Sequence, residues 1–172
     1  FFSKIVMAYS YKWDNKEANF GPPTSKQIDG GMHIAFEIIL KKDGEYVALR
    51  RPEAIPGHEH PLKKTKNGLL YFCHDLIKYG ETIESCIKRI VKEQTGVSVK
   101  NMKVVYIDSL VQNKDNQWAF TPHVIAELDK IPSSGKHGNE ITKVVIFNKS
   151  NIPDDFGWWT KKELKEFIEE FD

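Results

Sequence analysis

The segment His74–Val97, HDLIKYGETIESCIKRIVKEQTGV, predicts a loop that leads into an amphipathic helix. Thr82 stands where the N-cap belongs, because its hydroxyl can accept a hydrogen bond from a backbone N–H of the first turn. Gly96 stands where a left-handed C-cap belongs. The apolar residues expected on one buried helical face are Ile83, Cys86, Ile87, Ile90 and Val91.

The spacing of charged residues and glycines in this segment resembles the Nudix box, the signature of the Nudix hydrolase superfamily. That box reads G-x5-E-x7-R-E-U-x-E-E-x-G-U, in which U is a bulky apolar residue. Over residues 75–97 it is matched at Glu81, Arg89, Val91, Glu93, Gly96 and Val97. It departs at Asp75 (the opening glycine), at Ile90 (the glutamate after the arginine) and at Gln94 (the second glutamate of the pair).

The resemblance implies a structural and a catalytic group of positions. In the family, the pair at the positions of Glu81 and Arg89 braces the loop against the helix, and Gly96 completes this structural set. The family's glutamates at the positions of Ile90, Glu93 and Gln94 hold divalent cations and help to activate water. Mg²⁺ prefers oxygen ligands, so an isoleucine offers it nothing and a glutamine only a neutral oxygen. The box therefore predicts an intact brace and a depleted metal site.

Residues beside and beyond the box are candidates to complete that metal site. His74 and Asp75 replace the glycine pair that opens the loop in the family, and they either supply ligands or mark a loop that has drifted. Glu140 precedes an expected strand, where some Nudix enzymes place a base, although an exposed loop acid is the alternative. The candidate catalytic residues are thus Glu93, Gln94 and Glu140. The candidate ligands for Mg²⁺ or Mn²⁺, if the protein is active, are Glu93, Asp75 and His74.

Four residues are candidates for binding substrate. Arg50 and Arg51 end an expected hairpin shortly before the box, where they either meet phosphates or form a solvated rim. Trp118 and Phe120 alternate along one expected strand and share a face, so they either stack on a base or pack in the core. The segment His58-Glu59-His60 offers alternating metal ligands but lacks a third at a recognisable spacing, which favours exposed loop histidines.

The remaining pattern predicts a mixed sheet with helices on both faces. Strands are expected over residues 32–40, 46–51, 69–73, 101–111, 117–128 and 141–148, and a terminal helix with Thr160 as N-cap lies within 158–171. Hairpins combined with a strand–helix unit indicate an α/β (α+β) protein. The resemblance implies a Nudix-like α/β/α sandwich. We expect one domain at residues 32–172 and an N-terminal strand or arm, residues 1–31, packed on it.

Composition limits the partners. The 172 residues carry a net charge of +1, so charge gives no clear nucleic-acid signal. The sequence has no apolar run that could span a membrane and no secretory segment, so we expect a cytoplasmic protein without a membrane partner. The resemblance implies a nucleotide or another diphosphate small molecule as partner. The apolar N-terminal arm offers a strand for a homodimer.

Three hypotheses about function follow, because a fold does not fix a function. In the first, a Nudix-fold protein with a depleted metal site has weak or lost pyrophosphohydrolase activity and retains nucleotide or phosphate binding. In the second, a divergent but active hydrolase uses Mg²⁺ or Mn²⁺ and recruits ligands outside the box. In the third, the fold is a non-catalytic protein-interaction module.

Overall fold

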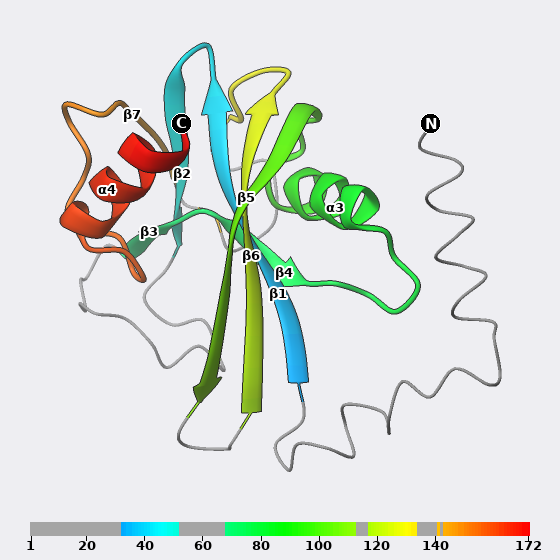
Figure 1. Cartoon of the computed structure of the whole chain (residues 1–172). Coiled ribbons are helices and arrows are strands. Elements are labelled where there is room, and N and C mark those ends of the chain that lie inside the picture. The colour runs from blue at the N-terminus through cyan, green and yellow to red at the C-terminus, as the bar shows by residue number, and fades with distance from the viewer. Residues whose placement is uncertain (1–31, 52–67, 113–116, 134–140, 142) are drawn as a thin grey trace, which may run out of the picture.

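The computed structural model describes residues 32–51, 68–112, 117–133, 141 and 143–172 (Figure 1). The expected arm at residues 1–31, the segment His58-Glu59-His60 and Glu140 lie outside the described residues, so their roles stay predictions. The elements are β1 (Met32–Lys42), β2 (Glu45–Arg51), β3 (Leu69–Tyr71), β4 (Cys73–Leu76), α3 (Ile83–Thr95), β5 (Val99–Gln112), β6 (Gln117–Leu128), β7 (Lys143–Phe147) and α4 (Lys161–Phe171).

The seven strands of the described chain form one mixed sheet in the order β3-β2-β1-β6-β5, with β4 beside β1 and β7 beside β2. The pairing of β1 with β6 is parallel, whereas the other pairings are antiparallel. The long strand β1 changes partner along its length, because residues 35–38 pair with β4 and residues 40–42 pair with β2. Asp43 and Gly44 join β1 to β2 with φ values of 51° and 85°, the positive values that a two-residue hairpin turn requires.

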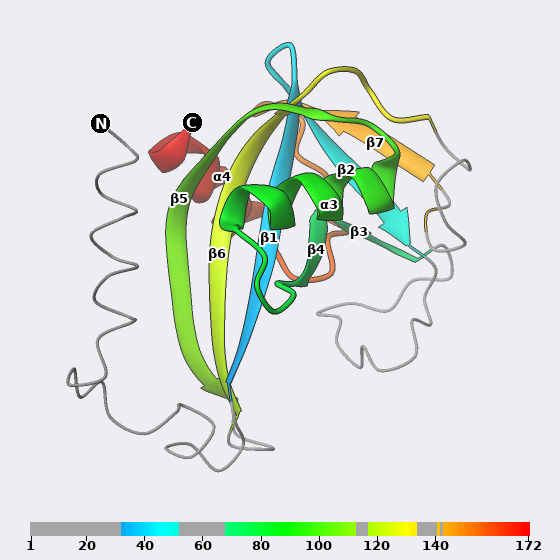
Figure 2. The same cartoon turned by 90° about the vertical axis from the view of Figure 1, so that its right-hand side faces the viewer.

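Helices α3 and α4 cover opposite faces of this sheet (Figures 1 and 2). One core lies under α3 and includes Ile38, Ile87 and Ile90. The other core lies under α4 and includes Ile39 and Leu164. Neighbouring residues of β1 enter different cores because successive side chains of a strand point to opposite faces. The predicted α/β/α sandwich with a mixed sheet is therefore confirmed.

The caps of α3 agree with the sequence pattern. The Thr82 hydroxyl accepts a hydrogen bond from the Ser85 amide, and Gly96 ends the helix with a φ of 71°. One expectation for this helix was wrong, because Ile83 is 53% exposed rather than buried. It lies in the first turn, ahead of the part of the helix that packs on the sheet.

A second difference concerns His74 and Asp75, which were expected in a loop. They belong to β4 and pair with Glu37 and Phe36 of β1. The length of β1 accounts for this. Its residues 40–42 pair with β2, and without β4 its residues 35–38 would have no hydrogen-bonding strand on the same edge. No helix within the described ranges is long and apolar enough to cross a membrane.

Candidate functional site

Arg89 is the centre of the loop–helix junction. Its Nε and Nη2 donate to the two carboxylate oxygens of Glu81 at 2.6 and 3.0 Å, and Nη2 also donates to the Leu76 carbonyl at 2.9 Å. Glu81 accepts a further hydrogen bond from the Lys78 amide at 2.9 Å. These bonds, led by the one from Arg89, lower the pKa of Glu81 to about 2. The brace expected from the box is present in the structure.

Replacing Glu81 by glutamine should remove part of the acid sensitivity of folding. The pKa of Glu81 is lowered from 4.5 to about 2, so its contribution to stability is full above pH 4.5 and is lost as the pH falls towards 2. The stability gap between wild type and Glu81→Gln should be largest at pH 6 and narrow below pH 4. Urea unfolding at several pH values measures this gap. Glu169→Gln is the control, because Glu169 pairs with Lys165 on the exposed surface of α4, and a constant gap for Glu81→Gln would contradict the prediction.

Two candidate metal ligands share the same arginine. Arg89 Nη1 donates to Asp75 Oδ2 and to Glu93 Oε2, each at 3.1 Å. Lys78 Nζ lies 3.7 Å from the other oxygen of Glu93. The fold therefore does bring Asp75 and Glu93 together, but around a guanidinium group.

The other two box positions are occupied in different ways. Ile90 is completely buried in the core under α3. The Gln94 side-chain oxygen accepts a hydrogen bond from Arg51 Nη2 at 2.6 Å, and its amide nitrogen donates to the His74 carbonyl at 2.7 Å. Gln94 thus ties the C-terminal part of α3 to β2 and β4. Within the part of the chain that the structure describes, no group of three or more His, Cys, Asp or Glu side chains could hold a metal ion.

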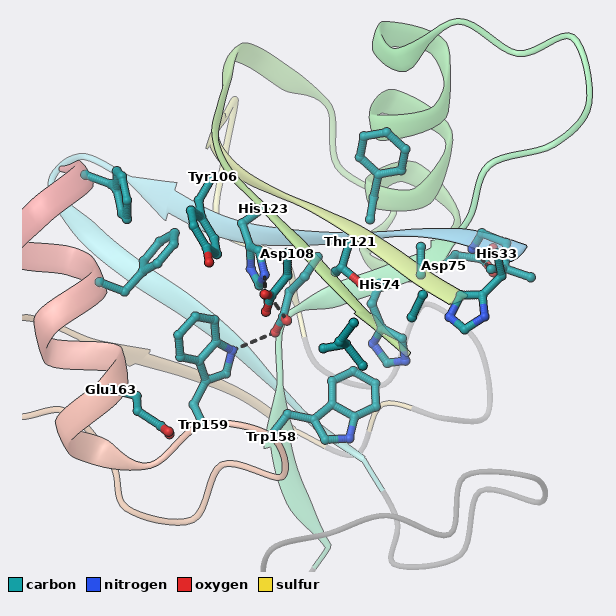
Figure 3. A pocket seen from close by; sticks show the side chains of 18 of the residues that line it. His33, His74, Asp75, Tyr106, Asp108, Thr121, His123, Trp158, Trp159 and Glu163 are labelled. Carbon is teal, nitrogen blue, oxygen red and sulfur yellow. Dashed lines mark hydrogen bonds and ion pairs between the residues drawn. The ribbon is translucent and has the colours of Figure 1, made fainter. Parts of the chain in front are cut away.

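An open cavity of about 1460 Å³ lies next to this junction. Side chains of β1, β4, β5, β6 and α4 line it, together with the loop before α4 (Figure 3). It also reaches Arg51 and Gln94, near the end of α3. Trp158 and Trp159 form part of its wall, and the Trp158 ring lies edge-on to the His74 ring with centroids 4.2 Å apart.

Three polar side chains lie together on the wall of this cavity, and we call them the acid–histidine cluster: Glu37, Asp108 and His123. Glu37 and His123 are register partners on β1 and β6, and Asp108 projects from β5. His123 lies between the two acids, with Nδ1 3.9 Å from Glu37 Oε2 and Nε2 4.0 Å from Asp108 Oδ2. Trp159 Nε1 donates to Glu37 Oε1 at 2.7 Å, which fixes the indole over the cluster.

Burial changes the protonation of this cluster. Desolvation raises the pKa of Glu37 from 4.5 to about 7, against the opposing hydrogen bond from Trp159, and the charge of Asp108 adds to the increase. Burial lowers the pKa of His123, which the charge of Asp108 opposes. At neutral pH the cluster therefore combines a neutral imidazole with an acid that is close to its own midpoint.

The structure brings some of the sequence candidates to the cavity and places others elsewhere. Arg51, His74, Asp75 and Gln94 line it. Arg50 instead pairs with Asp155 at 2.6 Å.

The two candidate aromatic residues share a face of β6, as expected, with ring centroids 6.3 Å apart. By the alternation of β6, Trp118 and Phe120 lie on the same face as Val124, which packs under α3. They are therefore on the other side of the sheet from the acid–histidine cluster. Their role in ligand binding stays a prediction.

The acid–histidine cluster was absent from the candidates drawn from the sequence. One signal was available, because Glu37 interrupts the apolar run MHIAFEIIL of a central strand, where an acid is costly unless it is paired or functional. His123 and Asp108 carry no comparable local signal. They become recognisable only when the register of β1, β6 and β5 is known.

The chain resembles known proteins over most of its length. The model of the NUDIX domain matches residues 32–167. The NAD-capped RNA hydrolase NudC of Vibrio atlanticus is 39% identical over 111 residues, which are 63% of this chain and 38% of that protein. The NudC of Photobacterium profundum is 34% identical over 79 residues, 46% of this chain and 26% of that protein. The chain therefore matches well under half of the length of these relatives.

A solved structure agrees on the fold. A NUDIX hydrolase from Nitrosomonas europaea superposes with a TM-score of 0.60 at 12% identity, covering 81% of this chain and 90% of that one. The box residues, the layered sheet and the match to the domain model all point to the same conclusion. The chain belongs to the NUDIX domain family.

Proposed function

We propose that this protein binds a nucleotide or a related diphosphate in its cavity and that its pyrophosphohydrolase activity is weak or lost. The observation that carries the proposal is the occupation of the box positions. Ile90 is buried in the core. The Gln94 side chain is hydrogen-bonded to Arg51 and to the His74 carbonyl. A single nitrogen of Arg89 donates to both Asp75 and Glu93.

The donor set does not fit the metal that the family uses. Divalent cations in such sites neutralise charge on the phosphoryl oxygens and lower the pKa of the attacking water. A hard cation needs several free oxygen ligands, whereas the carboxylates of Asp75 and Glu93 already face a guanidinium group. Removing one preorganised electrostatic group typically lowers a rate by about 10²–10³. Two changed glutamates in the box are therefore sufficient reason for weak turnover.

The binding half of the proposal is supported by the cavity and by the relatives. The cavity volume of about 1460 Å³ exceeds the roughly 300–1,000 Å³ of ordinary ligand pockets, so a nucleotide can fit in it. Tryptophan rings on one wall suit a planar base, and Arg51 at the other end suits a phosphate. The NudC relatives are named for hydrolysis of NAD-capped RNA, which supports a ligand derived from a nucleotide.

Calorimetry combined with an activity assay tests this proposal. ADP-ribose or a nucleoside triphosphate is titrated into the full chain with and without Mg²⁺ or Mn²⁺, and the same samples are analysed for released phosphate. We expect binding that depends little on metal, with little or no turnover. Substantial metal-dependent turnover would overturn the weak-activity proposal in favour of a divergent active hydrolase, and no binding of either ligand would favour an interaction module.

Glu93→Gln then identifies the source of any residual turnover. Glu93 is the one unaltered glutamate of the three box positions that hold cations in the family, so its replacement should abolish any metal-dependent release of phosphate and leave ligand binding within about twofold. Glu84→Gln removes the same charge from the exposed start of α3 and serves as the matched control. Equal turnover in wild type and Glu93→Gln would assign the chemistry to residues outside the box.

A further inference from the structure

Within the acid–histidine cluster, His123 is a buried residue with an unsatisfied ring nitrogen. His123 is only 6% exposed, and its Nδ1 has no hydrogen-bond partner among the residues that the structure describes. The contacts of His123 with Glu37 and Asp108, at 3.9 and 4.0 Å, are too long for hydrogen bonds. Buried polar groups are normally satisfied, so an exception calls for an explanation such as a catalytic role, local strain or a bound water or ion.

The carboxylates of the cluster offer hydrogen-bond acceptors to the cavity. Asp108 has a side chain that is 44% exposed and lines the cavity, so a ligand can reach its carboxylate. Glu37 also lines the cavity; its Oε1 accepts the hydrogen bond from Trp159, and its Oε2 lies 3.9 Å from His123 Nδ1. An ionised carboxylate only accepts hydrogen bonds, and Glu37, with a pKa of about 7, acts as such an acceptor in its ionised form. This end of the cavity therefore suits a group that presents N–H donors.

Aromatic rings surround His123 of the acid–histidine cluster. The rings of Tyr106, Trp159 and Phe167 lie 5.6–5.8 Å from the His123 ring, measured between centroids. Such walls favour a planar group over a flexible one. Glu163, Glu166 and Glu170 of α4 line the cavity too, so this end is acidic and disfavours phosphates. Arg51 lies on β2, across β1 and β6 from Asp108, and suits the phosphate end of a ligand.

From this arrangement we infer that the acid–histidine cluster binds the guanine edge of a nucleotide, with Asp108 and Glu37 accepting hydrogen bonds from the base. Guanine presents two adjacent donors, its N1–H and its 2-amino group. Adenine places a ring acceptor beside its amino group, and that acceptor would face a carboxylate. The inference rests on the proposed nucleotide binding and adds the class of base.

Calorimetric titration of the full chain with GDP, IDP and ADP tests the inference. IDP differs from GDP only by the missing 2-amino group, so it isolates one hydrogen bond. A hydrogen bond to a charged acceptor corresponds to about tenfold or more in affinity, and we expect GDP to bind at least about tenfold more tightly than IDP or ADP. The Asp108→Asn variant should lose this preference.

The direction of each change separates recognition from general charge. Asp108→Asn should weaken the binding of GDP more than that of IDP, because only GDP presents the 2-amino group, whereas loss of a general negative charge would strengthen the binding of both anionic ligands. Glu166→Gln removes a similar charge from another wall of the cavity and should keep the preference for GDP. Glu37→Gln provides a second variant and should lower the preference in the same direction as Asp108→Asn.

The possible outcomes distinguish this inference from the proposed function. A preference for GDP that Asp108→Asn removes and Glu166→Gln retains supports the inference. Equal affinities for GDP, IDP and ADP overturn it and leave nucleotide binding intact. A GDP preference that survives both Asp108→Asn and Glu37→Gln assigns base selection to other residues and also overturns it. No binding of the three diphosphates overturns the inference together with the proposed binding function.

Discussion

The Ile90→Glu variant, which restores the carboxylate that the Nudix box has after its arginine, should be strongly destabilised rather than gain a metal site. Ile90 is fully buried in the core formed by α3 and the sheet. Truncating a buried isoleucine costs about 2–5 kcal/mol, and burying an unpaired carboxyl group adds a further penalty. A loss of about 5 kcal/mol or more approaches the whole stability of many domains. Urea unfolding followed by circular dichroism would measure it.

Two further measurements make the result specific. Ile90→Val keeps the site apolar and should cost only about 0.5–1.5 kcal/mol. Thermal unfolding of Ile90→Glu with and without Mg²⁺ tests whether the new carboxylate reaches a metal, since an ion that binds only the folded state raises the melting temperature. Stability close to wild type, together with a gain on adding Mg²⁺, would show that position 90 is open to a metal and would contradict the depleted site.

The local parts of this fold could be predicted from the sequence because local rules determine them. Thr82 and Gly96 mark the ends of α3 through hydrogen bonding and a left-handed φ, and neither depends on distant residues. The Asp43-Gly44 turn is similar. The errors occurred where a distant segment decides the structure. His74 and Asp75 form a strand because β1 pairs with them, and Ile83 is exposed because α3 packs through its later turns.

The same distinction applies to the candidate site. Glu81 lies in the loop just before α3 and Arg89 lies within the helix, and the box spacing could predict their contact. The acid–histidine cluster joins Glu37, Asp108 and His123 across three strands, and only the sheet register brings them together. Sequence patterns assign a residue to a strand and a face, but they do not state which residue on another strand lies opposite. The acid–histidine cluster on the cavity wall was therefore found only in the structure.

The Glu37→Gln variant should gain stability relative to wild type as the pH rises from 4 to 8. The pKa of Glu37 is raised from 4.5 to about 7 in the folded protein. Its contribution to stability is thus full below pH 4.5 and is lost as the pH rises through about 7. A shift of this size corresponds to roughly 3 kcal/mol, at about 1.4 kcal/mol per pKa unit. Glutamine does not titrate, so the variant lacks this loss.

The geometry explains why glutamine should be tolerated. Its side-chain oxygen can still accept the hydrogen bond from Trp159 Nε1, and its amide can donate towards the unsatisfied Nδ1 of His123. Other titratable groups that line the cavity include Asp108 and Tyr106 on β5, His123 on β6, His74 on β4 and three glutamates of α4. They are present in both proteins, so the difference between the two stability curves isolates Glu37.

Urea unfolding of both proteins between pH 4 and pH 8 provides the measurement. The lowered pKa of His123 makes both proteins less stable as the pH falls below 6.5, so each curve alone mixes two opposite effects. Their difference should rise between pH 4.5 and about 7 and then level off. Parallel curves would mean that Glu37 keeps an ordinary pKa, and hence that water reaches its carboxylate. In that case Glu37 would be a solvated carboxylate that accepts a hydrogen bond from Trp159, and the cluster would not contain an acid with a raised pKa.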